Sequence, residues 1–575
     1  MKAKHLLLLV FAVSLFHASS PVRAQVNTAD SLALVDLYNN TNGAEWKKSG
    51  NWLTSRRLST WYGVTVTGAR VTSLSLSGNR LKGVLPASIG NATALTYLNL
   101  KSNGLKSAIP PSIGNLTALT YLDLGNNNFS SIIPSSIGNL ILLTYLNLGY
   151  NSLRGALPPS IGNLTGLTSL LLNANRLSDS IPSSIGNLSK LTSLYLEFND
   201  LTGAIPASIG NLTNVAKLGL SDNQLSGPLP SSIYHLTQLY NLALSGNALS
   251  GTLSDSVSNW ANVVYIFLQD NQFTGPLPAG FGNLKKVYTI NVTNNHFSGS
   301  IPASLSGCTV MYDFEAENNQ LSGAIPAALG QAPDLQFFYA GNNNLSGELP
   351  LSLLTAPTMH NISVAHNHIS AARNYNPNVP VTVSDVNVSF NNYNFNGLEF
   401  LATKVLRPVY SSQAPLPLHK RGNRLAVAAG GTLANNTYSW YKTGTVAAVA
   451  VIKGDSSFEP TASGQYFANV TNKIATGLTL TTDTIQYSVT TADAGALPLV
   501  SLSPNPARNE LLISRLTANE DVTITVTDMT GYVWLTVKSR NRTMLKIDIN
   551  RLHSGNYLLH LNDGKHISTQ PFVKE

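Results

Sequence analysis

The chain has 575 residues, of which 43% are hydrophobic and only 11% are charged, about half the usual share of charge in a soluble protein. Its 36 Lys and Arg against 28 Asp and Glu give a net charge of +8, but residues 25–400 hold 16 basic and 17 acidic side chains. This balance excludes a nucleic-acid groove in the largest segment. The single cysteine, Cys308, excludes an intramolecular disulfide and a thiolate metal cluster.

Residues 1–24 have the pattern of a secretory signal peptide. Lys2 and Lys4 precede an apolar run at 6–16, and a small-residue cleavage site lies at 22–24. That apolar run is too short to cross a bilayer, and no later apolar run approaches the length of a transmembrane helix. We therefore expect an exported protein without a transmembrane span.

Asparagine recurs with a constant period of 24 at fourteen positions, beginning with Asn79 and Asn103 and ending at Asn391. Around each lies the pattern LxxLxLxxNxL, and a proline follows at a fixed offset in eleven of the first twelve repeats, with Ser254 as the exception. This period and pattern are those of a leucine-rich repeat. The predicted fold is a leucine-rich-repeat solenoid, with a curved parallel β-sheet of about 14 coils of about 24 residues, followed by two small all-β sandwich-like domains.

The residue types of the repeat have a physical reason. Leucines at alternate positions of a short strand point inward, while the asparagine turns the chain and its amide can satisfy backbone groups of the neighbouring coil. An unsatisfied buried polar group costs about 1–3 kcal/mol, so the coils need these amides. Cys308 occupies a leucine position and is predicted to be a buried core residue. The predicted structural ladder includes Asn103, Asn127, Asn151, Asn175, Asn199 and Asn223.

The repeat LxGxIPxxIGNLTxL resembles the plant-type leucine-rich repeat of plant receptor kinases, of polygalacturonase-inhibiting proteins and of some bacterial surface proteins. Residues 25–70, with Trp46, Trp52 and the run at 59–64, resemble the N-terminal cap of that family. The predicted solenoid then covers residues 71–400. The resemblance implies a fold built for recognition and leaves the ligand open.

Two further segments follow the predicted solenoid. Residues 405–492 contain alternating strand patterns around Trp440 and Tyr466 and resemble an immunoglobulin-like β domain. Residues 499–575, with the run Ser-Pro-Asn-Pro at 503–506, resemble the type A C-terminal sorting domain of the type IX secretion system of Bacteroidota. That resemblance implies export by the type IX secretion machinery, followed by release or by attachment to lipopolysaccharide on the outer cell surface.

Side chains two, four and six positions before each ladder asparagine are expected to project from the concave face of the sheet. Exposed aromatic rings there can anchor a glycan or a protein, although cross-strand packing between coils is an alternative. The carboxylates at 313–317 would suit a cationic partner or calcium, and a merely solvated acidic face is the alternative. The candidate binding residues are Tyr97, Tyr121, Tyr145, Tyr195, Glu197, Tyr265, Phe267, Asp313, Glu315, Glu317, Phe337 and Tyr339.

Paired carboxylates also suit glycoside hydrolysis, but that reaction needs an acid with a raised pKa in a cleft. We expect an open strand to provide no such desolvation. No motif predicts a catalytic residue, a metal site or a cofactor. The sequence therefore predicts a non-enzymatic secreted or surface recognition protein for a glycan or protein ligand. An inhibitor of polysaccharide-degrading enzymes and an ice-binding protein are the alternatives.

Overall fold

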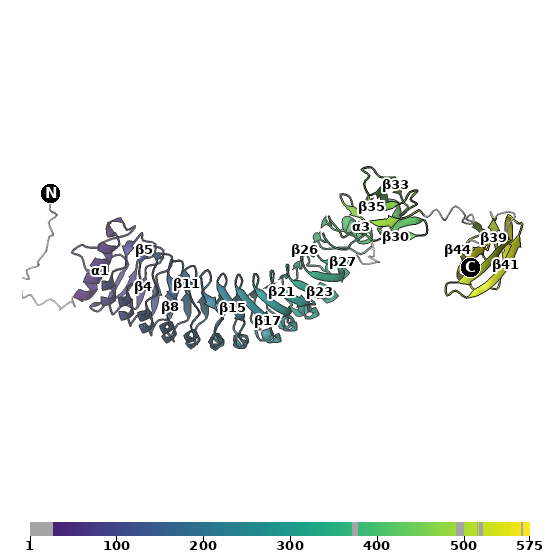
Figure 1. Cartoon of the computed structure of the whole chain (residues 1–575). Helices are drawn as coiled ribbons and strands as arrows, with labels where there is room; N and C mark the ends of the chain where they lie inside the picture. The colour runs from purple at the N-terminus through teal and green to yellow at the C-terminus, as the bar shows by residue number, and fades with distance from the viewer. Residues whose placement is uncertain (1–26, 371–377, 490–499, 515, 517–520, 565–566) are drawn as a thin grey trace, which may run out of the picture.

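The structure, a computed structural model, describes residues 27–370, 378–489, 500–514, 516, 521–564 and 567–575, so the predicted signal peptide lies outside it. Figure 1 shows a curved solenoid, a β domain at its C-terminal end and a further β domain after it. The long parallel sheet and the antiparallel sheets that follow confirm the predicted fold class. No helix among these residues is long and apolar enough to cross a membrane.

A small cap closes the N-terminal end of the solenoid core. It comprises α1 (Thr28–Asn40), η1 (Gly43–Glu45), η2 (Leu58–Thr60) and β1 (Val64–Thr67). The rings of Tyr38, Trp46, Trp52 and Trp61 pack together with centroids 4.8–6.0 Å apart. Such aromatic contacts add to the burial of apolar surface, so the cap is held without disulfides.

The main sheet has 16 strands, and only its first pair is antiparallel. Fourteen of its strands, β2 to β28, each precede one of the fourteen repeated asparagines, and the last strand lies inside the segment predicted as part of the 405–492 domain. In spatial order after β1 the strands are β2 (Arg70–Ser75), β4 (Tyr97–Asn99), β6 (Tyr121–Asp123), β8 (Tyr145–Asn147), β10 (Ser169–Leu171), β12 (Ser193–Tyr195), β14 (Lys217–Gly219), β16 (Asn241–Ala243), β18 (Tyr265–Phe267), β20 (Thr289–Asn291), β22 (Asp313–Glu315), β24 (Phe337–Tyr339), β26 (Asn361–Ser363), β28 (Asp385–Asn387) and β29 (Arg407–Val409).

Eleven coils contain a short 3-10 helix that usually follows the repeat proline, because proline presets the extended backbone of the helix N-cap. At the exception, the Ser254 hydroxyl accepts a hydrogen bond from the Ser256 N–H instead. These helices are η3 (Ala87–Asn91), η4 (Pro111–Asn115), η5 (Ser135–Asn139), η6 (Pro159–Asn163), η7 (Ser183–Asn187), η8 (Ala207–Asn211), η9 (Ser231–His235), η10 (Asp255–Asn259), η11 (Ala279–Asn283), η12 (Ala303–Gly307) and η13 (Ala327–Gln331), with the short α2 (Leu351–Leu354) in the next coil.

A second set of short strands follows the asparagines and forms three smaller parallel sheets. Their strands are β3 (Lys82–Val84), β5 (Gly104–Ser107) and β7 (Asn128–Phe129); β9 (Arg154–Ala156) and β11 (Arg176–Ser178); and β13 (Thr202–Gly203), β15 (Gln224–Pro228), β17 (Ala248–Thr252), β19 (Gln272–Pro276), β21 (His296–Gly299), β23 (Gln320–Ala324), β25 (Asn344–Glu348) and β27 (His368–Ser370).

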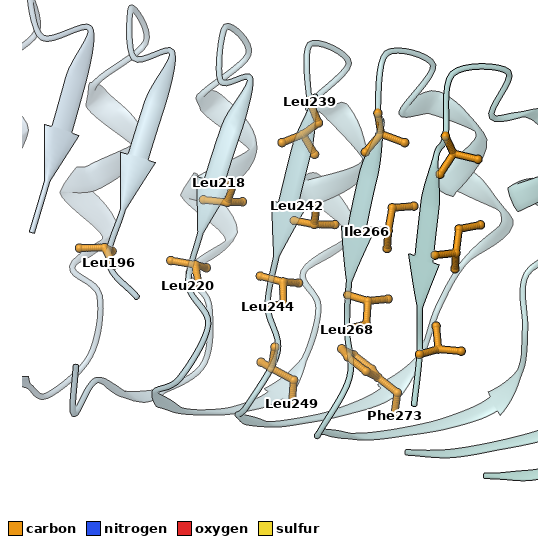
Figure 2. Close-up of a cluster of buried hydrophobic side chains, with 14 of the residues drawn as sticks. Leu196, Leu218, Leu220, Leu239, Leu242, Leu244, Leu249, Ile266, Leu268 and Phe273 are labelled. Carbon is orange, nitrogen blue, oxygen red and sulfur yellow. The ribbon is translucent and has the colours of Figure 1, made fainter. Parts of the chain in front are cut away.

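The core is a column of aliphatic side chains that repeats from coil to coil. Figure 2 shows Leu242, Leu244 and Leu249 of one coil beside the equivalent Ile266, Leu268 and Phe273 of the next. All six are fully buried. Cys308 is also fully buried, donates its thiol to the Phe281 carbonyl at 3.1 Å, and has a pKa that burial raises to about 11, as a core residue should.

Each ladder asparagine ties two coils together. The Asn127 amide nitrogen donates to the carbonyls of Leu100 in the preceding coil and Leu124 in its own, both at 3.0 Å. Its side-chain oxygen accepts from the Leu105 N–H at 3.1 Å. The same three contacts recur at Asn151, with the carbonyls and N–H one repeat further along.

The middle domain follows helix α3 (Phe395–Lys404) and shares one buried core with the solenoid. Trp440 is fully buried and lies opposite Ala468 on the neighbouring strand. Its elements are β30 (Leu418–Arg421), β31 (Arg424–Val427), η14 (Leu433–Asn435), β32 (Asn436–Lys442), β33 (Ala450–Lys453), β34 (Ser457–Phe458), β35 (Gly464–Asn472), β36 (Thr479–Thr481) and β37 (Ile485–Tyr487).

The C-terminal domain has its own buried core, distinct from that of the solenoid. Three strands form one antiparallel sheet and four form another. They are β38 (Ser501–Ser503), β39 (Glu510–Ser514) and β42 (Met544–Asp548) in the first, and β40 (Asp521–Asp528), β41 (Val533–Arg540), β43 (Gly555–Asn562) and β44 (Ile567–Lys574) in the second.

Candidate functional site

The solvent-facing side of the 16-stranded sheet, here called the sheet face, carries the predicted binding residues. They lie six, four or two positions before a ladder asparagine, with the buried leucines between them. Because the register advances by one repeat per strand, each position forms a column across the sheet. The structure brings the predicted residues together in two groups, with Tyr195 and Glu197 between them.

The first group is a stack of three tyrosines. The rings of Tyr97, Tyr121 and Tyr145 lie nearly parallel, with centroids 4.4 and 4.5 Å apart. Both faces of the central ring are therefore covered by protein, and burial raises the pKa of Tyr121. This is the cross-strand packing that was the alternative to ligand binding. The stack can offer ring edges and hydroxyls to a partner, but its middle ring has no free face.

A buried carboxylate fixes the polar edge of this stack. Asp123 accepts hydrogen bonds from the Gly125 N–H and the Asn147 amide, both at 2.9 Å, and from the Tyr121 hydroxyl at 3.3 Å. Asp123 is only 2% exposed. With its acceptor sites used by the protein, Asp123 belongs to the structure of this group rather than to a ligand site.

The second group is larger than the sequence analysis indicates. Tyr240, Tyr288 and Tyr312 lie seven positions before ladder asparagines, a column that the prediction did not consider, and they contact the predicted aromatic residues. Tyr288 and Tyr312 stack at 4.7 Å, and Tyr312 lies 5.1 Å from Phe337. The aromatic array is Tyr240, Tyr265, Phe267, Tyr288, Tyr312, Phe337 and Tyr339.

This array remains accessible to a partner. Tyr240 is 42% exposed and Tyr288 is 38% exposed, and the other members are partly buried. A signal for the missed column does exist in the sequence, because tyrosines at 240, 288 and 312 are separated by multiples of the repeat period. Partly exposed aromatic rings held by neighbouring rings lose little freedom on binding, which favours their use as anchors.

Three carboxylates lie beside the array on and after β22. The Asn291 amide donates to Glu315 at 2.5 Å, while one oxygen of Asp313 is buried and has no hydrogen-bond partner among the described residues. Burial and the neighbouring Glu315 raise the pKa of Asp313 to about 8, and burial also raises the pKa of Glu317. The expectation that an open strand provides no desolvation is therefore wrong, because side chains of adjacent strands remove water from these carboxylates.

A hollow of about 580 Å³, here called the acidic hollow, adjoins these carboxylates. Asp385 on its wall pairs with Arg407 on β29 at 2.6 Å, and the hydrogen bond from Arg407 holds the pKa of Asp385 below its ordinary value. The lining residues are Glu315, Glu317, Tyr339, Asn361, Ser363, Asp385, Val386, Asn387, Arg407 and Val409. Its acidic wall suits a cationic group, with Tyr339 beside it as an aromatic surface.

Glu197 lies alone in the middle of the sheet face. A Cβ atom on Gly219 would be only 1.6 Å from a carboxylate oxygen of Glu197, so the glycine provides the space in which this side chain lies. Its other oxygen is buried without a partner among the described residues, and burial raises the pKa of Glu197 to about 7. This carboxylate joins neither the tyrosine stack nor the acidic hollow.

The carboxylates do not form a metal centre. Within the described ranges, no group of three or more His, Cys, Asp or Glu side chains is placed to hold a metal ion. Asp313, Glu315 and Glu317 alternate along one chain segment with Phe314 and Ala316, which point into the core. The calcium interpretation therefore gains no support, and a cationic partner and a merely solvated acidic face remain the two interpretations of these residues.

Comparison with known families identifies two parts of the chain. Residues 134–226 match a leucine-rich repeat region, and residues 69–129, 262–284 and 286–308 match further leucine-rich repeats. Residues 501–575 match a secretion system C-terminal sorting domain. No curated protein matches the chain.

Solved structures resemble the solenoid. They include PEPR1-AtPEP1 (28% identity, TM-score 0.61, 67% of this chain and 55% of that one), the plant peptide hormone receptor RGFR1 in complex with RGF2 (30%, 0.52, 60% of each chain) and the Arabidopsis receptor kinase HAESA with the peptide hormone IDA and the co-receptor SERK1 (27%, 0.55, 64% and 66%). This chain thus spans only part of their length. The chain therefore carries leucine-rich repeats within residues 69–308 and a type IX secretion system C-terminal sorting domain at residues 501–575.

Proposed function

We propose that this protein acts at the cell surface or after release from it, and that its sheet face binds a protein ligand rich in Lys and Arg. The sorting domain indicates type IX secretion and a surface or secreted location. Leucine-rich repeats support a protein-binding role, and the similar plant receptors bind peptide hormones, as their descriptions state. A glycan ligand at this surface is the weaker candidate, because its carboxylates favour a cation.

One observation carries the proposal: Asp313, Glu315 and Glu317, on and just after β22, lie among the strands β16 to β24 that hold the aromatic array. Residues 195–400 hold 12 acidic and 4 basic side chains, so the surrounding field is also negative. A guanidinium or ammonium group gains both from a carboxylate and from an aromatic face. Because these side chains project from a hydrogen-bonded sheet, they are positioned before the ligand arrives, which reduces the entropy cost of binding.

The same surface supports binding rather than catalysis. Asp313 and Glu315 lie on one strand at positions two apart, on an open face. A hydrolytic site would need an acid and a second group arranged around a substrate bond, whereas these two carboxylates lie side by side on one strand. The raised pKa of Asp313 instead makes its charge depend on pH near neutrality.

The test uses the full chain and two labelled probes, nona-arginine and nona-aspartate. The triple variant Asp313→Asn, Glu315→Gln and Glu317→Gln should weaken nona-arginine binding at least tenfold. The control Glu348→Gln removes an exposed carboxylate on β25, away from the sheet face, and should leave binding unchanged. Equal affinity in the wild type, the triple variant and the control would refute the proposal. Capture of secreted hydrolases on the same surface would identify the ligand as an enzyme and favour the inhibitor alternative.

A second candidate, ice binding, is favoured by a regular row of threonines. Thr96, Thr120, Thr144, Thr168 and Thr192 are exposed, and each hydroxyl donates to the carbonyl one repeat earlier at 2.9–3.1 Å. The row therefore repeats at the spacing of one strand, about 4.8 Å. Ice crystals grown with the protein should become faceted if this row binds ice, and round discs would dispose of this candidate.

A further inference from the structure

A second hollow of about 550 Å³ lies on the sheet face near its N-terminal end, over β4 to β12. It shares no residue with the acidic hollow or the aromatic array. Its lining residues are Lys101, Asn126, Asn147, Tyr150, Leu171, Asn173 and Tyr195. We call it the tyrosine hollow. Of these residues, only Tyr195 is among the binding residues predicted from the sequence.

Tyr150 occupies an unusual backbone position for its size. It is 63% exposed and has φ of 55°, in the left-handed region that favours glycine and asparagine. The residue before the ladder asparagine has this conformation in every described coil from Asn79 to Asn391, and it is most often Asn, Asp or Gly. His366 and Phe390 are also aromatic at this position and stack on each other at 4.0 Å, and Phe198, two coils beyond Tyr150, has φ of 56° and 60% exposure.

The exposed rings of Tyr150 and Phe198 are not explained by the needs of the fold. A bulky residue in the left-handed region costs about 1–3 kcal/mol, and an exposed ring regains little of this by burial. The neighbouring Ala174, in the same position of the intervening coil, shows that a small side chain suffices there. A large ring held in solvent beside a hollow is therefore available to a ligand.

The polar lining defines which ligand fits. Lys101 is exposed and takes part in none of the ion pairs among the described residues. The Asn126 side-chain amide donates to the Ser102 hydroxyl at 3.1 Å, which leaves the side-chain oxygen of Asn126 as an acceptor for a ligand. Residues 25–194 hold 12 basic and 5 acidic side chains, so this part of the chain has a net positive charge, while Asp123 is hydrogen-bonded to Asn147 and Glu197 lies two positions after Tyr195. An anionic ligand is favoured here, in contrast to the acidic hollow.

We infer that the tyrosine hollow binds an anionic saccharide. The C–H face of a sugar ring packs on an aromatic ring such as Tyr150 or Tyr195. Sugar hydroxyls both donate and accept hydrogen bonds, which matches the carboxamides of Asn126 and Asn173. The carboxylate or sulfate of the sugar pairs with Lys101. This site lies on the N-terminal part of the sheet face and shares no residue with the aromatic array or the acidic hollow, to which the protein ligand is assigned.

The experiment uses the full chain and calorimetric titration. The probes are a hexamer of galacturonic acid, the same hexamer with its carboxylates methyl-esterified, a heparin hexasaccharide and hexaglutamate. Three variants separate the contributions: Lys101→Gln removes the cation, Tyr150→Asn removes the ring, and Phe390→Asn makes the same change at the same coil position, far from the hollow.

We expect the galacturonate or the heparin hexasaccharide to bind, and which one binds identifies the acidic group. Lys101→Gln and Tyr150→Asn should each weaken the binding of that saccharide at least tenfold, and Phe390→Asn should leave it unchanged. Because asparagine suits the left-handed backbone, the melting temperature of Tyr150→Asn should equal or exceed that of the wild type, so lost binding would not reflect unfolding.

Several outcomes would overturn this inference. They are no binding of either acidic saccharide, wild-type affinity in both Lys101→Gln and Tyr150→Asn, undiminished affinity for the methyl-esterified hexamer, or hexaglutamate binding that matches the saccharide, which would indicate a peptide site. The triple variant at 313, 315 and 317 should bind the saccharide like the wild type. That control separates failure of this site from failure of the acidic surface.

Discussion

A single glycine in most coils sets how closely those coils can stack. In the run Ile-Gly-Asn, a Cβ on Gly114, Gly138 or Gly162 would lie 2.3–2.4 Å from a serine carbonyl oxygen of the next coil. No real contact is that short, so any side chain would push the coils apart. The glycine recurs here because of close approach between coils rather than because of its backbone freedom.

We predict that Gly138→Ala destabilises the solenoid. Its Cβ would meet the Ser160 carbonyl oxygen at 2.4 Å, and overpacking of this kind costs about 1–3 kcal/mol. The melting temperature measured by scanning calorimetry should fall. The control is Gly166→Ala, where the nearest atom would lie 3.4 Å away, an ordinary contact. Unchanged melting in both variants would contradict the packing argument.

The buried carboxylates predict a dependence of stability on pH. The pKa of Asp313 is raised from 3.8 to about 8 in the folded protein. Between about pH 4 and pH 8 the folded state therefore binds more protons than the unfolded state, and stability falls as pH rises through this window. Asp313→Asn should melt like the wild type near pH 5 and at a higher temperature near pH 8.5. The control Asp334→Asn changes an exposed acid in the next coil, and its melting temperature should follow that of the wild type at both pH values.

At the scale of the element, two neighbouring coils of the solenoid depart from the repeat at two linked positions. Tyr234 stands where the preceding six coils have the stacking glycine, and Ser254 stands where they have proline. The Ser254 N–H donates to the buried Tyr234 hydroxyl at 3.0 Å. Proline has no N–H, so it would leave this hydroxyl without the donor. The missing proline is thus a consequence of the tyrosine.

We predict that the repeat proline can be restored at position 254 without loss of stability only when the hydrogen bond between Ser254 and Tyr234 is absent. Ser254→Pro alone should lower stability by about 1–3 kcal/mol, because it breaks a buried hydrogen bond. In the background of Tyr234→Phe, which keeps the ring, the same substitution should be neutral or stabilising. Urea denaturation of the four proteins in this cycle measures the coupling. Additive effects would show that the two positions are independent.

The sequence predicts the elements well because their pattern is local. Leucines and asparagines at fixed spacing determine strand, turn and register, and fourteen strands follow that register. The site is less predictable because it depends on neighbours across strands. Spacing does not reveal that Tyr312 leans onto Phe337, or that Asp313 loses water to adjacent side chains. Strand β29 carries none of the repeat residues, so the pattern could not predict it.

At the scale of the molecule, the solenoid and the middle domain form one unit. Strand β29 completes the main sheet, and Gln413 donates to the Val388 carbonyl at 2.9 Å. Burial opposes the ionisation of Glu399 on α3, but hydrogen bonds from Asn472, Asn435 and Thr432 outweigh it and lower its pKa. The core continues across this junction without a break.

We predict that a fragment of residues 25–400 is less stable and more prone to aggregate than one of residues 25–489. The shorter fragment lacks β29 and exposes the edge of β28, and an uncovered strand edge invites pairing between molecules. Light scattering and melting temperature of the two fragments provide the measurement. Identical behaviour would show that the middle domain contributes nothing to the solenoid.

The uniform register of the coils makes their number a molecular ruler. Strands β8 and β24, beneath the tyrosine hollow and beside the acidic hollow, are eight steps apart in the sheet, or roughly 38 Å at about 4.8 Å a step. Excising one whole repeat between them would leave every asparagine opposite a matching neighbour and bring the two hollows one step closer. Gain or loss of whole coils therefore changes the spacing between the two proposed sites without altering the residues of either one.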